Sequence, residues 1–449
     1  MSGTDKAGGD RFDAIVIGSG SAGSAFSKRA AANGARVAMV EMAELGGVCV
    51  NRGCVPKKLM WHSAHERREA NGLAASGYIR EPSELDYGLL HRRIGEHVSS
   101  IRHSFAEAMD DCGVTVISGK AELSDDGVRV GDRTLRADRV IIACGGRPTA
   151  MDIPGWDLCD TSDGVFGWTE RPERILIIGG GYIGVEFATV FSGLGSTVTI
   201  ADEGKHLLDG FDPDAVALAE KHLREGGVTL MLPAELREVE RSGSALLAHL
   251  SDGGTVECDR VVVAIGRTPR IDELGPAAQS LDVAKNGSLE VSDTFETSHA
   301  GWHAIGDAAN RMPLTPVARR DGEWLADHLF GDEAGERLDL SLVATATYCD
   351  PPLAQVGVTD NDEHDLHVEK GDLDPLRNGL FERSGARATY LHKTLSEGPD
   401  GRLRGMALVS RTAPDEISYV ATLLAVGADR AALDRPGSVH PTFAEEFIG

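Results

Sequence analysis

The sequence predicts an α/β fold with two Rossmann-like domains, followed by a C-terminal α+β domain. The chain has 449 residues, which is too long for one core of ordinary size. A pattern of strand, glycine-rich turn, helix and second strand occurs twice, over residues 12–41 and 174–203. Residues from 334 onward hold alternating strand-like runs and one helix-like run, which is typical of an α+β domain.

The first repeat contains a dinucleotide-binding fingerprint in the context that it requires. An apolar run, Ala14–Ile17, leads into Gly18-x-Gly20-x-x-Gly23, and the second apolar run ends at Glu41. The glycines allow a tight turn and a close approach of a pyrophosphate to the helix N-terminus. Glu41 lies where an acidic residue accepts hydrogen bonds from the adenosine ribose.

The second repeat has the same fingerprint in Gly179-x-Gly181-x-x-Gly184, and its second strand ends in Asp202-Glu203. Two fingerprints predict two dinucleotides, and we expect FAD and a nicotinamide whose rings meet for hydride transfer. Asp202 would bind the free ribose 2′-hydroxyl of NADH and repel the 2′-phosphate of NADPH. No arginine follows in the next turn, so NADH is favoured, although Lys205 keeps NADPH possible.

Other apolar runs that end in glycine complete the predicted flavin domain. Gly306-Asp307 places a carboxylate after a strand-like run, where it could hold the ribityl chain of a flavin or equally cap the following helix. Glycine- and proline-containing segments near residues 150 and 270 mark the crossings between domains. The expected boundaries are 1–149 with 270–333 for the FAD domain, 150–269 for the nicotinamide domain and 334–449 for the C-terminal domain.

The composition narrows the class of protein. Hydrophobic residues make up 41%, which indicates a globular chain. The net charge of −25 argues against a nucleic-acid partner, because phosphate binding requires a basic face. No apolar run suits a membrane span and the polar start lacks a signal-peptide core, so we expect a cytoplasmic protein without membrane contact. The seven cysteines match neither a secreted disulfide framework nor a zinc module, and we expect no metal.

Cys49 and Cys54 form the close cysteine pair of the chain, in GGVCVNRGCVPKK. An offset of five residues spans roughly 7.5 Å along a helix, whereas a disulfide needs Cα atoms within about 4.4–6.8 Å. The turn through Asn51–Gly53 must therefore be distorted if the pair is bridged. So short a loop is a poor structural staple, whereas a metal would need two further ligands. Metal binding and ordinary buried thiols remain alternatives, but we favour a redox pair whose thiolates are stabilised at the N-terminus of the next helix.

Together with GGGYIGVE, AIGD and HPTFAEEF, this motif resembles the pyridine nucleotide–disulfide oxidoreductases over nearly the whole chain. GCVPKK followed by LMWHSA is most similar to glutathione reductases, whereas lipoamide dehydrogenases usually read GCIPSK at this place. The resemblance implies a homodimer with FAD, NAD and interface domains, in which each active site takes a histidine from the partner subunit.

The resemblance also implies roles for individual residues. Cys54 would be the sulfur beside the flavin, and Cys49 would attack a small-molecule disulfide substrate. Lys57 and Glu186 would form a pair near the reactive flavin nitrogen, and Tyr182 would cover the nicotinamide pocket.

His440 would be the general acid/base that acts across the dimer, and Glu445 would orient it from a helix that begins near Thr442. Further cofactor contacts are expected from Ser21, Gly47, Val48, Lys58, Gly145, Thr315 and Gly266.

The predicted substrate pocket departs from that of the glutathione reductases. These enzymes commonly place an arginine on the helix after LTPVA, for a carboxylate of glutathione, where this chain has Glu323. Lys28 still supplies a cation on the first helix, and His97 and Phe105 stand where tyrosines are expected. We therefore expect that the substrate is not glutathione disulfide itself. A similar disulfide that lacks a carboxylate of glutathione, or that carries a positive group, is expected instead.

Other functions compete with this interpretation. Dihydrolipoamide dehydrogenase is favoured by the NADH-type site and disfavoured by GCVPKK. Mercuric-ion reductase and the large thioredoxin reductases need a C-terminal cysteine pair, and no cysteine follows Cys349. A non-catalytic flavoprotein subunit is disfavoured because Cys49, Cys54 and His440 are all intact.

Overall fold

The computed structural model describes residues 11–80, 84–309, 311–359, 365–381 and 387–448. The chain forms two compact units, each assembled from three segments. Unit 1 comprises Met1–Pro56, Arg92–Thr149 and Arg267–Leu340. Unit 2 comprises Lys57–His91, Ala150–Gly266 and Ser341–Gly449. The three-domain boundaries given above remain a prediction, and residues 57–91 group with unit 2.

Unit 1 is built on a sheet in the order β3-β2-β1-β6-β5-β4, with β17 also paired to β6. The pairs β1–β2, β2–β3, β1–β6 and β6–β17 are parallel, whereas β4, β5 and β6 pair antiparallel. The strands are β1 (Arg11–Ile17), β2 (Val37–Glu41), β3 (Thr115–Ser118), β4 (Ala121–Ser124), β5 (Gly127–Val130), β6 (Arg133–Ile142) and β17 (Trp302–Ala304). A separate antiparallel pair consists of β7 (Gly146–Pro148) and β16 (Arg267–Pro269).

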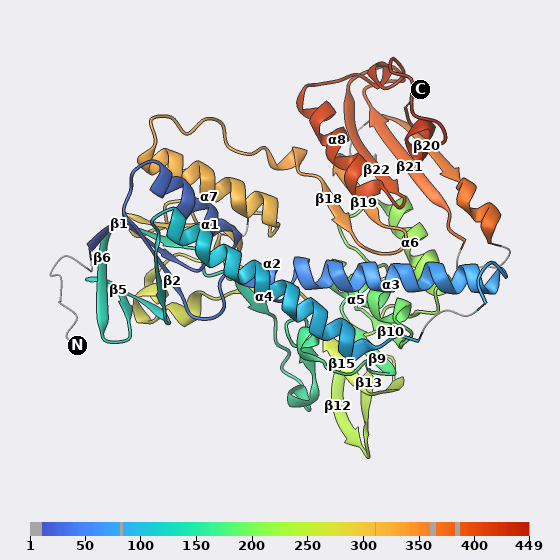
Figure 1. Cartoon of the computed structure of the whole chain (residues 1–449), viewed down its shortest axis with the longest axis horizontal. Helices are drawn as coiled ribbons and strands as arrows, with labels where there is room; N and C mark the ends of the chain where they lie inside the picture. Colours follow the sequence, from blue (N-terminus) through green and yellow to red (C-terminus); the bar gives the residue numbers. More distant parts are fainter. Residues whose placement is uncertain (1–10, 81–83, 310, 360–364, 382–386, 449) are drawn as a thin grey trace. The chain divides into compact units, whose positions relative to one another are not determined.

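Helices α1 (Ser21–Ala32) and α7 (Thr315–Phe330) lie side by side in unit 1 (Figure 1). Their contact is close because Gly322 has no side chain, and a Cβ there would lie 2.4 Å from the carbonyl oxygen of Ala22. Phe26 and Leu325 are fully buried in the core that these helices form with β1. The remaining helices of this half of the sequence are α2 (Gly47–Asn51), α3 (Cys54–Ala75) and α4 (Tyr87–Asp111).

Unit 2 contains a second, all-parallel sheet in the order β11-β10-β9-β15-β8. Its strands are β8 (Asp160–Thr161), β9 (Arg174–Ile178), β10 (Thr197–Ala201), β11 (Thr229–Met231) and β15 (Arg260–Val263), and its helices are α5 (Tyr182–Gly193) and α6 (Pro213–Glu225). A meander of β12 (Leu236–Ser242), β13 (Ala245–Leu250) and β14 (Thr255–Cys258) is inserted before β15. Two sheets with parallel central strands, in which a glycine turn follows β1 and β9 respectively, confirm the predicted fold class.

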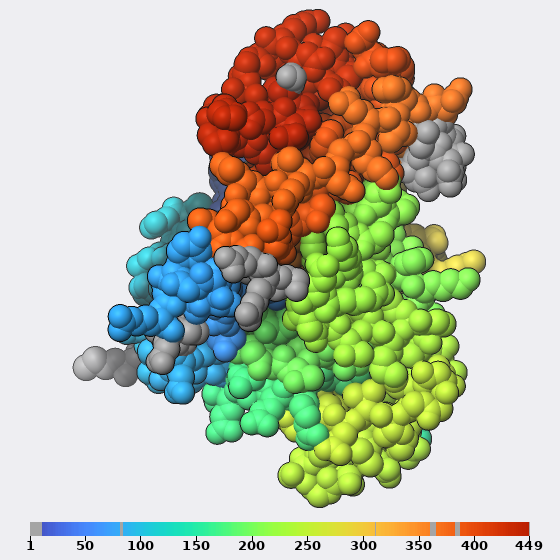
Figure 2. Space-filling view, turned by 90° about the vertical axis from the view of Figure 1, so that its right-hand side faces the viewer, coloured from blue at the N-terminus to red at the C-terminus, as the bar shows by residue number. Residues whose placement is uncertain are grey.

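The C-terminal part of unit 2 is a five-stranded antiparallel sheet in the order β18-β19-β22-β21-β20. Its elements are β18 (Thr345–Thr347), β19 (Leu353–Gly357), β20 (His367–Leu373), β21 (Tyr390–Ser396), β22 (Leu403–Val409) and α8 (Ala413–Ala425). Ile417 and Val420 of α8 pack on Met406 and Leu408, which makes this the expected α+β part. Figure 2 shows its surface in orange to red beside the green segment of the same unit.

Short 3₁₀ helices connect these elements. They are Trp156–Leu158, Gly164–Gly167, Ile271–Leu274, Pro276–Ser280, Gly306–Ala308, Leu340–Leu342, Leu376–Leu380, Arg430–Ala432 and Phe443–Glu446. Within the described ranges, every helix is too short or too polar to cross a bilayer.

Candidate active site

The first glycine turn joins β1 to α1. Gly18 has φ +105°, and a Cβ on it would lie 2.3 Å from the carbonyl oxygen of Ala143 at the end of β6. A Cβ on Gly23 would lie 2.1 Å from the carbonyl oxygen of Gly18. Gly20 differs from both, because a Cβ there would meet nothing within 4 Å. Gly18 and Gly23 are therefore required by the packing of the chain, and Gly20 leaves open space at the helix N-terminus.

The carboxylate of Glu41 is tied to this turn. It accepts hydrogen bonds from the main-chain N–H of Ser19 at 2.9 Å, from the Ser19 hydroxyl at 2.7 Å and from the N–H of Ala43 at 2.9 Å. The Ser19 hydroxyl in turn accepts from the N–H of Gly46 at 3.0 Å. This network fixes the acidic group at the end of β2, beside the open helix N-terminus.

The second glycine turn, between β9 and α5, repeats this geometry. Gly179 has φ +111°, and its Cβ would lie 2.5 Å from the carbonyl oxygen of Ala264. A Cβ on Gly184 would lie 2.0 Å from the carbonyl oxygen of Gly179, whereas a Cβ on Gly181 would meet nothing within 4 Å. Asp202 accepts from the N–H of Gly180 at 2.7 Å, as Glu41 does from Ser19.

Both turns fit a dinucleotide. Each precedes a helix whose N-cap glycine provides no side-chain cap, so the N–H groups of the first helical turn have no capping side chain. At the second turn, Asp202 also accepts from the N–H of Gly204 at 2.7 Å, and Glu203 is exposed. The open space at the middle glycine and the carboxylate beside it are what a pyrophosphate and a ribose require.

Other predicted cofactor residues of unit 1 lie near the first turn or at element ends. A Cβ on Gly47 would lie 2.6 Å from the Cα of Gly20, so the start of α2 touches this turn. Asp307 lies in the 3₁₀ helix after β17, and burial raises the pKa of its carboxyl. Ser21 and Thr315 are the first residues of α1 and α7, and Val48 is the second residue of α2. Gly145 follows the end of β6 and has a positive φ.

The cysteine pair lies where the chain leaves α2 and enters α3. α2 ends at Asn51, and α3 begins at Cys54, so the helix is interrupted between the two cysteines. Gly53 permits this path, because a Cβ on it would lie 2.9 Å from the carbonyl oxygen of Val48. Neither cysteine is in a disulfide in this structure, and Cys54 is the more exposed. Its sulfur lies 3.7 Å from the hydroxyl oxygen of Thr315.

The Cys49 thiol is hydrogen-bonded to its neighbour Cys54. The pKa of Cys49 lies far above its usual range, first because its thiol hydrogen-bonds Cys54 and second because it is buried. A hydrogen bond with Thr315 acts in the opposite direction but does not prevail. In the reduced pair, its neighbour and its burial therefore act against a Cys49 thiolate, and stabilisation of both thiolates by the helix N-terminus stays a prediction.

Lys57 and Glu186 form a mostly buried ion pair in unit 2. The Lys57 ammonium lies 2.8 Å from Oε1 of Glu186, and their side chains are 13% and 8% exposed. The same carboxylate oxygen accepts the main-chain N–H of Tyr348 at 3.0 Å. A pair this buried is costly to break, since removal of one partner leaves the other charge without compensation.

Two aromatic residues that sequence reasoning missed surround the neighbouring lysine. The Lys58 ammonium lies 3.5 Å from the ring centroid of Tyr348 and 4.2 Å from that of Trp61. Burial, and then the charge of Lys57, lower the pKa of Lys58 to about 8. No local pattern indicates Tyr348, because it lies almost 300 residues away in the sequence.

The remaining predicted nicotinamide residues lie near the second turn. Tyr182 is the first residue of α5, directly after Gly181, and is 41% exposed. Gly266 follows β15 with φ +114°. A Cβ on Gly266 would meet nothing within 4 Å, so this glycine also borders open space.

His440 and Glu445 are brought together near the C-terminus. Nδ1 of His440 lies 2.8 Å from Oε2 of Glu445, which belongs to the 3₁₀ helix Phe443–Glu446. The His440 side chain is 81% exposed, whereas that of Glu445 is 26% exposed. The carboxylate therefore orients an exposed imidazole through its Nδ1 atom, and Nε2 of the same ring is the nitrogen that Glu445 does not contact.

The four predicted substrate residues occupy α1, α4 and α7 of unit 1. The Lys28 ammonium lies 5.5 Å from the ring centroid of Phe105, and His97 is exposed on the same helix as Phe105. Glu323 accepts from Arg319, one helical turn earlier, at 2.9 Å. Its charge is thus compensated on its own helix, which weakens the argument that Glu323 repels a substrate carboxylate.

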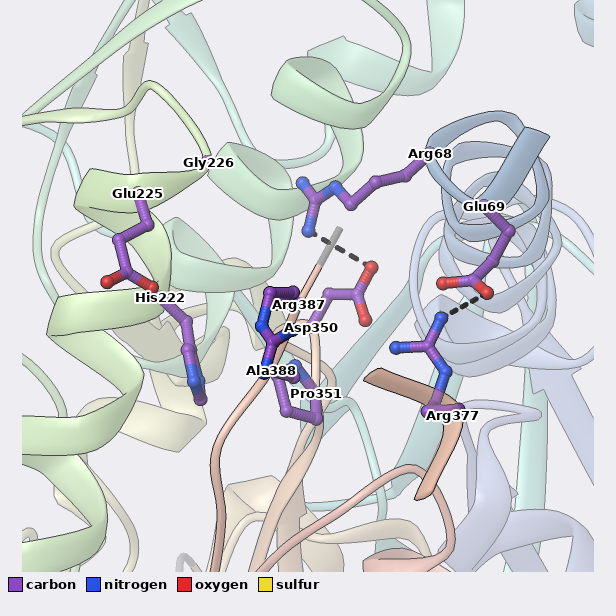
Figure 3. A pocket seen from close by; sticks show the side chains of 10 residues that line it. All are labelled: Arg68, Glu69, His222, Glu225, Gly226, Asp350, Pro351, Arg377, Arg387 and Ala388. Atoms are coloured by element: carbon purple, nitrogen blue, oxygen red, sulfur yellow. Dashed lines mark hydrogen bonds and ion pairs between the residues drawn. The ribbon is translucent and has the colours of Figure 1, made fainter. Parts of the chain in front are cut away.

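Unit 2 also contains a polar pocket, which is a second candidate ligand site (Figure 3). Each of its arginines already holds a carboxylate: Arg68 pairs with Asp350, Arg377 with Glu69, and Arg387 with Asp374 just outside the lining. The pocket is therefore charge-balanced and does not favour an anion. Its lining is Arg68, Glu69, His222, Glu225, Gly226, Asp350, Pro351, Arg377, Arg387 and Ala388.

His222 is the buried histidine of this pocket. Its Nε2 accepts the main-chain N–H of Thr389 at 3.2 Å, which places the proton of the neutral ring on Nδ1. Burial lowers the pKa of His222 to about 4. Nδ1 finds no hydrogen-bond partner in the described part of the chain.

Groups of histidine, cysteine and carboxylate side chains that suit a metal ion are absent from the described residues.

Comparison with known proteins places the chain among oxidoreductases. A family described as "Pyridine nucleotide-disulphide oxidoreductase" matches residues 12–322, and its "dimerisation domain" matches residues 343–448.

Curated relatives agree over almost the full length. A protein named "Glutathione reductase" from Nostoc sp. (strain PCC 7120 / SAG 25.82 / UTEX 2576) is 33% identical over 456 residues, which cover 97% of this chain and 98% of the relative. "Glutathione reductase" from Burkholderia cepacia is 33% identical over 442 residues, with the same coverage. "Glutathione reductase, chloroplastic/mitochondrial" from Pisum sativum is 31% identical over 470 residues, which cover 100% of this chain and 84% of the relative.

Proposed function

The chain belongs to the pyridine nucleotide–disulphide oxidoreductase family, and from this premise we propose that it reduces the disulfide of a low-molecular-weight thiol. The observation that carries the proposal is the pair Cys49 and Cys54. These thiols meet at an interruption between two helices, in the same unit as the first glycine turn. Such a pair serves thiol–disulfide exchange better than it serves stability.

FAD would be held by the Gly18–Gly23 turn, Glu41 and Asp307, and the nicotinamide cofactor by the Gly179–Gly184 turn and Asp202. When bound, the two cofactors supply the electron pair that reduces the Cys49–Cys54 disulfide. The chain's own residues bind the pyrophosphates at the helix N-termini and orient the ribose hydroxyls.

The cysteines then perform two successive exchanges. The Cys49 thiolate attacks one sulfur of the substrate disulfide, forms a mixed disulfide, and releases one substrate thiolate that takes up a proton. The Cys54 thiolate attacks the Cys49 sulfur, releases the second substrate thiolate and restores the Cys49–Cys54 disulfide. Because the pKa of Cys49 is raised, its proton must be removed before the first attack, and an imidazole suits this task.

His440 is proposed as this acid/base group, supplied by the partner subunit of a homodimer. Its exposed ring and its hydrogen bond to Glu445 support the assignment, and the family description of residues 343–448 as a dimerisation domain supports the dimer. Glu445 stabilises the protonated imidazole and fixes its tautomer.

NADH is proposed as the preferred electron donor. Asp202 accepts N–H groups from Gly180 and Gly204, so its carboxylate is held in place beside the turn. A 2′-phosphate placed there would meet this negative charge. Equal or better use of NADPH at the same concentration would refute the preference.

For the substrate, the relatives' printed names support glutathione disulfide. The presence of Glu323 in place of the expected arginine supports a thiol that lacks a carboxylate or carries a positive group, and this support is reduced because Arg319 compensates the Glu323 charge. We propose a thiol that lacks this carboxylate or carries a positive group as the substrate. We also propose that the enzyme is cytoplasmic. An assay of glutathione disulfide, bis-γ-glutamylcystine and an amidated glutathione disulfide with NADH ranks the candidates. Preference for unmodified glutathione disulfide would overturn the role of Glu323, and activity with lipoamide alone would favour dihydrolipoamide dehydrogenase.

The proposed chemistry is tested by anaerobic titration of the flavin-loaded protein with NADH. Long-wavelength absorbance should appear as the Cys54 thiolate forms beside the flavin. Cys54→Ser should abolish this absorbance and turnover, whereas Cys49→Ser, the matched control, should abolish turnover and keep the absorbance. The same absorbance in Cys54→Ser would overturn the assignment of Cys54.

A further inference from the structure

Tyr348 follows β18 in unit 2 and contacts three charged groups. The Lys57 ammonium lies 4.2 Å from the centroid of its ring, and the Lys58 ammonium lies 3.5 Å from it. Its main-chain N–H donates to Glu186 at 3.0 Å. One residue therefore touches both lysines and the carboxylate that pairs with Lys57.

Two adjacent ammonium groups repel each other, and both lie partly out of water. Glu186 compensates Lys57, but among the described residues no carboxylate forms an ion pair with Lys58. The negative face of an aromatic ring attracts a cation without adding a formal charge. The Tyr348 ring therefore supplies attraction for Lys58 while leaving Glu186 to Lys57.

Trp61 completes the aromatic surroundings of Lys58. Its ring centroid lies 4.2 Å from the Lys58 ammonium and 5.7 Å from the Tyr348 centroid, in an edge-on arrangement. The indole N–H of Trp61 donates to the carbonyl oxygen of Cys349 at 3.1 Å, next to Tyr348 in the sequence. The two rings are thus fixed to each other as well as to the lysine.

The other charges around Lys58 are identifiable. Lys57 on α3 opposes its protonation, whereas Glu186 on α5 and Asp415 on α8 favour it. Because neither carboxylate forms an ion pair with Lys58 among the described residues, the aromatic contacts are its short-range attraction.

We propose that Tyr348 is a positioning residue, whose ring face holds the Lys57 and Lys58 ammonium groups and thereby keeps Lys57 paired with Glu186. This inference rests on the proposed function, together with the expectation from the family resemblance that Lys57 lies near the reactive flavin nitrogen. The contact itself requires neither cofactor nor turnover, so it can be tested separately.

The test varies the charge of the ring face while keeping its shape. Tyr348 is replaced by phenylalanine, 4-fluorophenylalanine and 3,4,5-trifluorophenylalanine, and peptide mass spectrometry measures acetylation rates of individual lysines at pH 7.5. We expect the Lys57 and Lys58 rates to rise with each fluorine step, at least threefold across the series for Lys58. Lys120 is exposed and should react equally in all variants. Equal Lys58 rates across the series would overturn the proposal, because a purely steric role does not follow fluorination.

A second readout tests positioning. NADH reduction of the bound flavin, followed by stopped-flow absorbance, should slow along the same series. An acetylation trend with unchanged flavin reduction would overturn the positioning role. Absence of disulfide reductase activity in the unmodified protein would instead overturn the proposed function, and the acetylation series would still report on the contact.

Discussion

Acidification from pH 7.5 to 5.0 is expected to destabilise the fold through His222. The folded pKa of His222 is about 4 because the ring is buried, whereas an unfolded histidine has a pKa of about 6.5. Between these values the unfolded chain binds more protons than the folded chain, so stability is complete above pH 6.5 and declines as the pH falls toward 4.

The magnitude follows from these two pKa values. At pH 5.0 the unfolded state gains a factor of about 30 in statistical weight over the folded state, which corresponds to about 2 kcal/mol. At pH 7.5 the same contribution is close to zero. His222 is 8% exposed, so solvent screening reduces this figure only modestly.

His222→Gln isolates the effect, because glutamine accepts the N–H of Thr389 but does not titrate. Burial also lowers the pKa of His303 and of His392, so the wild type alone would mix several contributions. Urea unfolding at fixed protein concentration, followed by tryptophan fluorescence, gives the free energy of unfolding of both proteins at each pH.

We expect the stability of the wild type relative to His222→Gln to fall by about 2 kcal/mol between pH 7.5 and 5.0. A difference that changes by less than about 0.5 kcal/mol would show that His222 is not held neutral by burial.

Two further predictions concern the proposed chemistry. Gly23→Ala and Gly184→Ala place a Cβ 2.1 Å and 2.0 Å from the carbonyl oxygen that opens the respective turn. The first should lose bound FAD, seen as loss of yellow colour, and the second should keep FAD but no longer be reduced by NADH; loss of FAD from both would contradict separate sites. Glu445→Gln removes the charge beside His440, so disulfide turnover should fall roughly tenfold or more, whereas flavin reduction by NADH in stopped flow should be unchanged. Slower flavin reduction would contradict the proposal that Glu445 acts in the reduction of the disulfide substrate.

The sequence predicts best where function depends on neighbours along the chain. The two glycine turns and the acids Glu41 and Asp202 are fixed by spacing within one strand–helix–strand unit, and the structure places each acid on its own turn. The interruption between Cys49 and Cys54 could likewise be anticipated, since helix geometry alone forbids a bridge across five residues.

Long-range contacts could not be predicted in this way. The ring of Tyr348 contacts Lys57 and Lys58, although the whole second Rossmann segment separates these residues in the sequence. No periodicity links the three positions. The raised pKa of Cys49 also escaped prediction, because it depends on a specific thiol–thiol hydrogen bond and on burial. The expectation for Glu323 likewise did not include its pairing with Arg319, one helical turn earlier.

The glycines of the two turns are subject to different kinds of selection. Gly18 and Gly179 are required by the strand ends at Ala143 and Ala264, so a chain with no cofactor would still need them to fold. Gly20 and Gly181 face open space and are constrained only by what binds there. In a library selected for soluble protein alone, positions 20 and 181 should accept alanine and serine freely, while positions 18 and 179 stay glycine. Selection for activity should remove that tolerance, so the two libraries together would separate residues that build the fold from residues that serve its ligands.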